Sequence, residues 1–513
     1  MSEQQAEQIS AAYAIEGPAL ELGSVVVDGT PHPGARVRMP LSMLNRHGLV
    51  AGATGTGKTK TLQLIAEQLS AAGVPVFLAD IKGDVSGVAA PGADSERIRT
   101  RAEQTATDWS PTAYPAEFLS LGGLGTGTPV RATMTSFGPV LLSKVLGLNA
   151  TQESSLGLVF HFADKNGLPL LDLKDLRAVI NHLLSDEGKP ELKALGGLST
   201  ATAGVILREL IGLEDQGGDV FFGEPEFDTA DLIRLAPDGR GVLSVMGLAA
   251  VQDKPRLFST FLMWLLADLF SDLPEVGDVD KPKLVFFLDE AHLLFDDASE
   301  AFLDALARTV RLIRSKGVGV FFVTQTPKDV PAEVLAQLGN RVQHALRAFT
   351  PDDAKALRAA VKTYPHSQYD LEELLTSLGT GEAVVTVLSE RGAPTPVAWT
   401  RMRAPQSLMA PSPEALLDQT IAASTIGAKY AAVADRESAY EKLAARVRAA
   451  PPPPAAPPRS PTPTAARKTT AAKEDPGLVE QVVKSSAFRS ALRSAGTVIG
   501  REITRSIFGT RKR

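Results

Sequence analysis

The sequence predicts an α/β protein with a mostly parallel sheet, a helical insert and a tethered C-terminal helix. Between residues 47 and 405, apolar runs alternate with segments of helical periodicity, which is typical of βαβ units. The runs are continuously apolar, as expected of strands that are covered on both faces. Near the end of the chain, residues 451–463 hold eight prolines in thirteen positions and set the last helical stretch apart.

Six apolar runs are expected to form the strands of the sheet. They are His47–Ala51, Val74–Asp80, Gly241–Met246, Lys283–Asp289, Val318–Thr324 and Glu382–Leu388. Between the second and third runs, at roughly 100–240, the periodicity is largely helical. We therefore expect a core at 47–405 that contains a helical insert.

The segments on either side of this core are expected to be smaller. Residues 1–46 are predicted to form an N-terminal leader with one strand-like piece, Gly23–Asp28. Residues 406–450 are predicted to form a helical extension that continues as one long helix from residue 411. Residues 451–475 are predicted to be an extended Pro-rich linker, and 476–513 a basic amphipathic tail helix.

Length and composition limit the class of protein. The 513 residues suffice for two or three domains, and 44% apolar with 22% charged residues is typical of a soluble globular protein. The absence of cysteine excludes disulfides, thiolate zinc sites and a cysteine nucleophile. The N-terminus is too polar for a signal peptide, and the longest apolar run, Leu257–Phe270, is shorter than the about 20 residues that a bilayer requires. These features predict a cytoplasmic protein.

A phosphate-binding motif follows the first predicted strand. Its residues, which match G-x-x-x-x-G-K-[ST], are Gly52, Ala53, Thr54, Gly55, Thr56, Gly57, Lys58 and Thr59. The glycines let backbone N–H groups curl around phosphates, Lys58 can bridge the β- and γ-phosphates, and the Thr59 hydroxyl can ligate Mg²⁺. A chance glycine-rich turn is the alternative, but an apolar strand precedes the motif and a periodic helix follows it. The motif predicts a site for ATP and Mg²⁺.

Two carboxylates end the fourth predicted strand, because residues 284–290 read Leu-Val-Phe-Phe-Leu-Asp-Glu. Ligands of open α/β sheets bind at the carboxyl ends of strands. We therefore expect Asp289 to lie beside the phosphate site and hold Mg²⁺ through water, and Glu290 to polarise the attacking water. The alternative, a helix N-cap without chemistry, is weak in a chain that already carries the phosphate motif.

A polar amide follows the next apolar run. Ala291 and His292 complete Asp-Glu-Ala-His, which also marks one class of superfamily 2 helicases, but no Ser-Ala-Thr motif follows. Val318–Thr324 is instead followed by Gln325. An amide at the tip of a strand beside the phosphate site suits a sensor of the γ-phosphate, and a plain strand-end turn residue is the alternative.

In their order along the chain, these motifs resemble the HerA–FtsK superfamily of P-loop motors, and within it the bacterial HerA-like helicase C-terminal domain family. The resemblance rests on Gly52–Thr59, on Asp289-Glu290 and on Arg314-Ser-Lys-Gly317 before the next strand. Asp80–Asp84 and Asn340–Asp353 also match. It implies a RecA-like P-loop NTPase core that hydrolyses ATP in a homo-oligomeric ring, usually a hexamer, and often moves on double-stranded DNA.

The resemblance also implies a site shared between subunits. In such rings an arginine of one subunit reaches the ATP of its neighbour. The match gives Arg314 as the first candidate for this role and Arg347 as the second. A surface or helix-end arginine is the alternative for both residues.

Two features lie outside the resemblance. HerA motors carry an N-terminal β-barrel, for which 46 residues are too few. The tail, 476–513, has eight Lys and Arg against two Glu, with an apolar stripe on the other side of the predicted helix. Such a helix can lie on the anionic inner face of a membrane, meet nucleic acid, or pack on its own ring, and the last is the simplest interpretation.

Three functions remain open at this stage. The leading hypothesis is an ATP-driven DNA translocase or helicase. A motor for protein secretion, as in type IV secretion ATPases, shares the fold. An ATP-switched scaffold, whose tail binds a membrane or a partner, belongs to a different class. The net charge of −6 argues against a surface coated with DNA-binding charge but not against a local basic channel.

Overall fold

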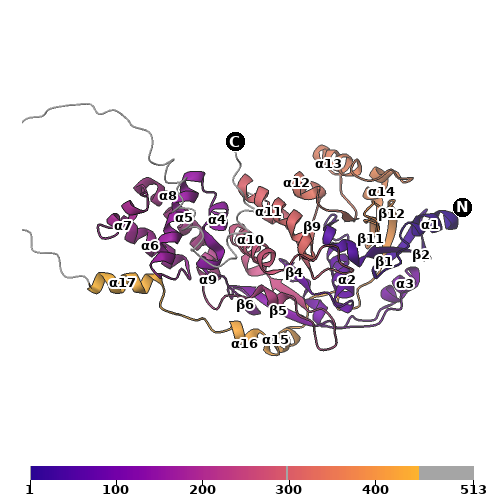
Figure 1. Cartoon of the computed structure of the whole chain (residues 1–513). Coiled ribbons are helices and arrows are strands. Elements are labelled where there is room, and N and C mark those ends of the chain that lie inside the picture. The colour runs from indigo at the N-terminus through magenta and orange to yellow at the C-terminus, as the bar shows by residue number, and fades with distance from the viewer. Residues whose placement is uncertain (1, 296–297, 450–513) are drawn as a thin grey trace, which may run out of the picture.

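The computed structural model describes residues 2–295 and 298–449, and a single mixed sheet of twelve strands forms its centre (Figure 1). In chain order the strands are β1 (Ala19–Val27), β2 (Thr30–Pro40), β3 (Gly48–Ala51), β4 (Val76–Asp80), β5 (Ala116–Leu121), β6 (Thr128–Val130), β7 (Leu243–Gly247), β8 (Leu284–Leu288), β9 (Val318–Thr324), β10 (Asn340–Gln343), β11 (Glu382–Thr386) and β12 (Ala398–Met402). Their order in the sheet is β2-β1-β12-β11-β10-β3-β9-β8-β4-β7-β5-β6.

The strands from β10 to β6 in this order run parallel, while β11, β12, β1 and β2 extend one side of the sheet as antiparallel neighbours. The predicted α/β class with a mostly parallel sheet is confirmed. All six predicted strands are present, with ends that differ by up to two residues from the expected bounds. The parallel block places the carboxyl ends of eight strands along one edge of the sheet.

Helices cover both faces of the sheet (Figure 1). They are α1 (Ser2–Ala11), α2 (Lys58–Ala71), α3 (Glu96–Gln104), α4 (Met134–Val145), α5 (Ala150–Lys165), α6 (Leu173–Leu184), α7 (Lys189–Ala194), α8 (Thr200–Leu213), α9 (Asp219–Phe221), α10 (Pro255–Asp272), α11 (Glu300–Ile313), α12 (Ala332–Leu335), α13 (Pro351–Val361), α14 (Leu371–Ser377), α15 (Glu414–Ala422), α16 (Gly427–Tyr430) and α17 (Ala439–Ala449). None of the helices in the described part of the chain is long and apolar enough to span a membrane.

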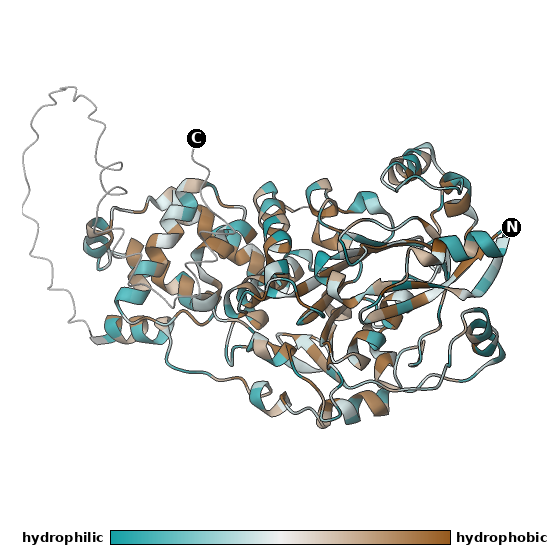
Figure 2. Ribbon diagram, turned by 45° about the vertical axis from the view of Figure 1, so that its right-hand side comes forward, coloured by the Kyte–Doolittle hydropathy of each residue, from teal (hydrophilic) through white to brown (hydrophobic). Residues whose placement is uncertain are grey.

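Strand β8 shows why the strands read as continuously apolar. Val285 and Phe287 pack into the core that contains α2, and Phe286 and Leu288 pack into the core that contains α10, α11 and the insert. All four side chains are fully buried. A strand with apolar partners on both faces needs no polar position, and the strongly apolar strands lie between the covering helices in Figure 2.

The helical insert lies between β6 and β7 and extends from the sheet at the end of the molecule opposite β1 and β2 (Figure 1). Two of its helices begin at capping boxes, α5 at Asn149 and α6 at Asp172. The insert was expected at roughly 100–240, and this start is wrong. Residues 116–121 and 128–130 form β5 and β6, because they extend the parallel block beyond β7.

The N-terminal leader is also not separate from the core, which corrects the predicted boundary at residue 46. Strands β1 and β2 form a hairpin whose turn holds Asp28 and Gly29 at φ of 49° and 75°, a conformation that suits a tight two-residue turn. Strand β1 pairs with β12, near the other end of the core. The hairpin therefore belongs to the central sheet.

The predicted long helix from residue 411 is wrong. The chain instead forms three short helices, α15, α16 and α17, because tertiary contacts hold the segments between them out of helical conformation. The Ala434 N–H donates to the Glu224 carbonyl at 3.2 Å, and Arg436 pairs with the same glutamate. Side-chain packing at Tyr430, which is fully buried against Phe227, fixes α16. The predicted linker at 451–475 and tail helix at 476–513 lie outside the described residues.

Candidate active site

The predicted motifs meet at the carboxyl ends of four neighbouring parallel strands, β3, β9, β8 and β4. Ala51 at the end of β3 lies opposite Thr324 of β9, and Phe322 of β9 lies opposite Leu288 of β8. The Gly52 N–H donates to the Thr324 carbonyl at 3.2 Å. Gln325 therefore starts beside the phosphate motif, between that motif and the carboxylates that follow β8.

The phosphate-binding loop has the backbone that its glycines predict. Gly57 has a φ of 118°, which favours glycine, and a Cβ there would lie 3.3 Å from the Gly381 nitrogen. The Lys58 ammonium donates to the Gly52 carbonyl at 2.6 Å and to the Ala53 carbonyl at 3.2 Å. Lys58 is buried, and burial lowers the pKa of its ammonium. Its hydrogen bonds to the loop hold the charge at the place where the motif would receive phosphates.

The Asp289 carboxylate is almost completely buried. Its side chain is 2% exposed, and burial, with the neighbouring Glu290 charge, raises the pKa of Asp289 to about 7. Within the described part of the chain, its Oδ2 atom is buried without a hydrogen-bond partner. A buried, unpartnered carboxylate oxygen is what a hard divalent cation such as Mg²⁺ takes as a ligand, directly or through water. The residues therefore fit the metal that the phosphate motif implies.

Glu290 combines an unusual backbone conformation with a basic side chain beside each carboxylate oxygen. Its φ is 45°, which is unusual for a residue with a side chain and recurs at functional sites. One carboxylate oxygen pairs with the Lys82 ammonium, and the other lies 3.2 Å from His292 Nδ1. The Glu290 side chain is 6% exposed whereas that of Lys82 is 43% exposed. The buried carboxylate thus meets a cation that enters from the solvent side.

Lys82 was not assigned a role by the sequence, although the Asp80–Asp84 segment contributed to the resemblance. The Asp80 carboxylate accepts hydrogen bonds from the N–H groups of Gly83, Asp84 and Val85, at 2.7–3.2 Å, and so closes the turn after β4 around itself. This turn directs Lys82 toward Glu290. The contact between two motifs that lie more than 200 residues apart could not be inferred without the strand order.

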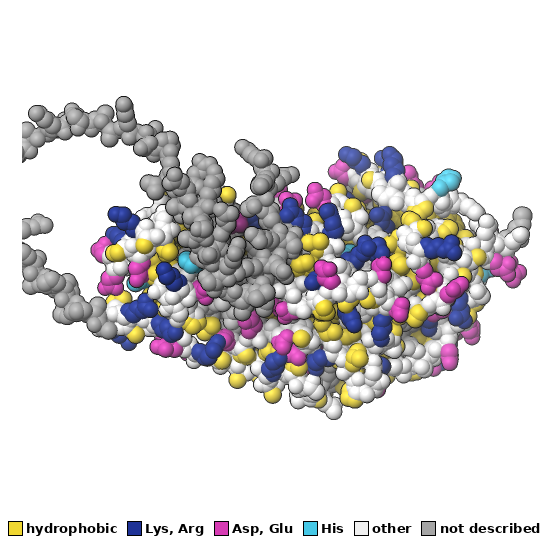
Figure 3. Space-filling view, in the orientation of Figure 1, with side chains coloured by type: hydrophobic (Ala, Val, Ile, Leu, Met, Phe, Trp, Pro, Cys, Tyr) yellow, Lys and Arg dark blue, Asp and Glu magenta, His cyan; other side chains and the backbone are white. Residues whose placement is uncertain are grey.

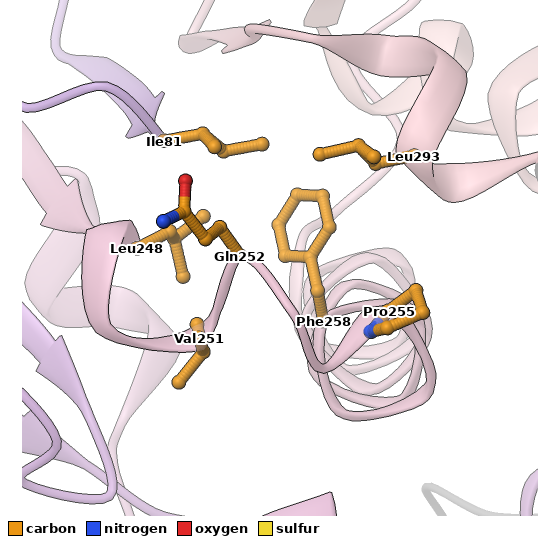
Figure 4. A pocket seen from close by; sticks show the side chains of 7 residues that line it. All are labelled: Ile81, Leu248, Val251, Gln252, Pro255, Phe258 and Leu293. Atoms are coloured by element: carbon orange, nitrogen blue, oxygen red, sulfur yellow. The ribbon is translucent and has the colours of Figure 1, made fainter.

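A small apolar cavity lies under this turn (Figure 4). Ile81, Leu293 and Phe258 point into it from the turn after β4, from the segment after Glu290 and from α10. Its volume of about 10 Å³ is far below the roughly 300 Å³ of a typical ligand site. The cavity is therefore part of the apolar floor that supports the two motifs and not a substrate pocket.

His344 supports the phosphate-binding loop from the other side and was also missed. It follows β10, is completely buried, and its Nδ1 lies 2.8 Å from the Glu382 carbonyl, while Nε2 lies 2.9 Å from the Thr61 hydroxyl. Burial lowers the pKa of His344 to about 4, so the ring is neutral, with the proton on the nitrogen that faces the carbonyl. A Cβ at Gly52 would lie 2.5 Å from the His344 Cβ. This histidine therefore packs directly against the loop and the first turn of α2.

The two candidate arginines occupy opposite edges of the sheet. Arg347 is exposed, and its Nη2 lies 3.4 Å from the Thr54 carbonyl in the phosphate-binding loop of its own chain. Arg314 follows α11 just before β9 begins, and the charges that act on it come from Arg46 and Asp278. Arg46 precedes β3, whereas the phosphate-binding loop follows β3. Arg314 therefore lies at the amino ends of the strands, away from the nucleotide site of its own chain.

The phosphate-binding loop follows β3, and the paired carboxylates follow β8, which is separated from β3 by β9. This arrangement in a parallel sheet defines a P-loop ATPase with a RecA-like core. The same order of motifs also characterises a narrower group. The chain belongs to the Helicase HerA-like C-terminal family, whose model matches residues 27–513. The predicted family and the predicted ATPase activity are thereby confirmed.

Curated relatives and a solved structure agree with this assignment. The chain is 23% identical over 381 residues to the DNA double-strand break repair helicase HerA of Sulfurisphaera tokodaii, covering 71% of this chain and 68% of the relative. It is 19% identical over 386 residues to that of Saccharolobus solfataricus, with 74% and 68% covered. The bacterial conjugative coupling protein TrwB shares the fold with a TM-score of 0.50 at 15% identity, over 79% of this chain and 95% of that one.

The burial of Asp289 leads to a prediction about how the stability of the folded protein depends on pH. Because the pKa of Asp289 is about 7 in the folded protein and 3.8 when exposed, the folded state binds a proton that the unfolded chain lacks, and stability falls as pH rises from about 4 to about 7. Asp289→Asn should therefore stabilise the nucleotide-free protein at pH 8, on the order of 4 kcal/mol. The advantage should shrink as the pH falls to 5, as measured by thermal unfolding at both values.

Asp418→Asn, which makes the same change of charge on the exposed side of α15, serves as the control and should show neither effect. A loss of stability for Asp289→Asn at pH 8 would contradict the prediction. It would mean that Lys58 and Lys82 already compensate the Asp289 charge without a metal.

Proposed function

We propose that this chain is an ATP-driven translocase that acts on double-stranded DNA as a homo-oligomeric ring. The observation that carries the proposal is the meeting of the phosphate-binding loop, Gln325, Asp289-Glu290 and the Asp80–Asp84 turn at four neighbouring strand ends. Two relatives are by name helicases of DNA double-strand break repair, which supports DNA as the polymer. Acidic and basic side chains are interspersed on the face shown in Figure 3, so this face offers no continuous basic surface for DNA.

In the proposed site, residues Gly52–Thr59 hold the triphosphate through backbone N–H groups, and Lys58 turns from the loop carbonyls to the β- and γ-phosphates. Thr59 and Asp289 would hold Mg²⁺, which neutralises charge on the phosphate oxygens when bound. The buried Asp289 Oδ2 atom, which has no hydrogen-bond partner within the described residues, would gain one in the metal or its bound water.

Hydrolysis places the attacking water between Glu290 and the γ-phosphate. The water oxygen bonds to the γ-phosphorus, the bond from that phosphorus to the β–γ bridging oxygen breaks, and the proton of the water passes to the Glu290 carboxylate. Gln325, exposed at the end of β9, would donate to a γ-phosphate oxygen. Lys82 and His292 each lie beside one Glu290 oxygen, and each oxygen keeps a lone pair that could accept the proton.

The arrangement of the arginines supports a shared site. Arg314 is separated from the nucleotide of its own chain by the length of β3, so a role for it in hydrolysis requires a neighbouring subunit. A head-to-tail contact that closes into a ring would bring the amino edge of one sheet to the carboxyl edge of the next. Arg347 contacts its own phosphate-binding loop and is assigned to the same chain's site.

Duplex DNA should raise the rate of ATP hydrolysis several-fold at low salt, and the stimulation should fall as salt is raised, because DNA binding releases counterions. The measurement is the steady-state ATPase rate with and without duplex DNA, on a sample whose oligomeric mass is known from light scattering. Lys58→Ala is the negative control. An unchanged rate for ring-sized protein would refute a DNA motor and favour a secretion-type motor or an ATP-switched scaffold.

Arg314→Ala should bind ATP normally but hydrolyse it at a rate lower by about 10³-fold, because a trans-acting arginine stabilises charge on the transferred phosphoryl group. Mixing it with inactive Lys58→Ala protein should restore part of the activity, since mixed rings pair an intact loop with an intact arginine. Arg311→Ala, an exposed position one turn earlier, is the matched control and should remain active. Mixed assemblies that form without any recovery would rule out a trans role.

A further inference from the structure

A short segment between β10 and α13 raises an exposed aromatic ring beside the phosphate-binding loop. Phe349 is 82% exposed, the highest value among the exposed large apolar side chains of the described residues. A phenylalanine left in water forgoes the stabilisation that burial of an aromatic side chain normally provides. Its exposure would therefore be explained by a ligand or partner that covers the ring.

The segment that carries the ring is fixed at both ends. On one side, the Ala53 N–H donates to the Ala345 carbonyl at 2.8 Å, and the Leu346 N–H donates to the Leu375 carbonyl at 2.8 Å. On the other side, Thr350 caps α13 and forms a capping box with Asp353. Only residues 347–349 project between these anchors, and all three are exposed.

Arg347 links this ring to the phosphate-binding loop. Its guanidinium lies over the Phe349 ring, 6.0 Å from the ring centroid, and its Nη2 donates to the Thr54 carbonyl at 3.4 Å. The guanidinium thus spans the space between the aromatic face and the loop. One face of the ring is supported, and the rest remains available for stacking.

The strand order decides which part of a nucleotide would reach the ring. Gln325 and Glu290, which would face the γ-phosphate, follow β9 and β8 on one side of β3. β10 lies on the other side of β3 and leads directly to Phe349. A triphosphate whose γ end points toward β9 and β8 therefore directs its nucleoside end toward β10.

We propose that Phe349, steadied by Arg347, is a stacking platform for the base of the bound nucleoside triphosphate. This inference rests on the proposed ATP site in the Gly52–Thr59 loop. Stacking on a ring face requires no particular hydrogen-bonding pattern, so the platform favours nucleoside triphosphates over inorganic polyphosphate and discriminates little between adenine and guanine.

The test compares two ligands of the full-length protein, Mg-ATP and Mg-tripolyphosphate, by titration calorimetry. Phe349→Ala should weaken ATP binding roughly 5- to 150-fold, as expected for the loss of one stacked base, and leave tripolyphosphate binding within about 2-fold. Phe349→Tyr should retain the wild-type preference, and GTP should follow ATP in every variant. Tyr440→Ala, which removes a half-exposed ring from α17, is the matched control and should change neither affinity.

Each of the other outcomes would contradict either the stacking platform or the proposed ATP site. Unchanged ATP affinity in Phe349→Ala would overturn the platform, as would an equal loss for both ligands, which would instead make Phe349 a support of the loop. A changed oligomeric mass with unchanged affinities would place the ring in a subunit contact. If wild-type protein binds tripolyphosphate and ATP equally, the platform fails and the phosphate site stands. If it binds neither, or if Lys58→Ala binds both as tightly, the proposed ATP site itself fails.

Discussion

Asp289 and Glu290 are two adjacent carboxylates that the end of β8 holds almost entirely out of water. Burying two like charges side by side is unfavourable unless cations compensate them. The structure brings Lys82 to Glu290 from the turn after β4, and among residues 2–295 and 298–449 one Asp289 oxygen has no hydrogen-bond partner. The parallel sheet, the closed Asp80 turn and the apolar side chains of Ile81 and Leu293 hold these charged groups close together. A bound Mg²⁺ would add positive charge beside the two carboxylates.

The phosphate-binding loop is supported from both of its neighbouring strands. On the β9 side, it is tied to the Thr324 carbonyl, and on the β10 side, it packs against the neutral ring of His344 and is tied to the Ala345 carbonyl. The first side leads to the residues assigned to hydrolysis, and the second leads to Arg347 and Phe349. The loop therefore lies between the residues proposed to carry out hydrolysis and the ring proposed to stack on the base.

The central strands and the two main motifs were predictable from the sequence, because each is encoded in one short segment. Continuous apolar runs predicted the strands, and Gly52–Thr59 and Asp289-Glu290 each occupy one short segment. What the sequence did not show depends on pairing between distant segments. The contact of Lys82 with Glu290, the burial of His344 beside Glu382 and the pairing of β1 with β12 all join segments that are far apart in the sequence. The long helix expected from residue 411 failed because contacts to Glu224 and Phe227 outweigh local helical preference.

The most direct test of the site is the behaviour of Glu290→Gln, in which the amide keeps the shape of the side chain but cannot accept the proton of the attacking water. We expect this variant to bind Mg-ATP at least as tightly as the wild type and to hydrolyse it 10²- to 10⁴-fold more slowly, the usual contribution of a general base. Binding and single-turnover hydrolysis are measured on the same sample. Hydrolysis at the wild-type rate would contradict the assignment of Glu290 and require another residue to activate the water.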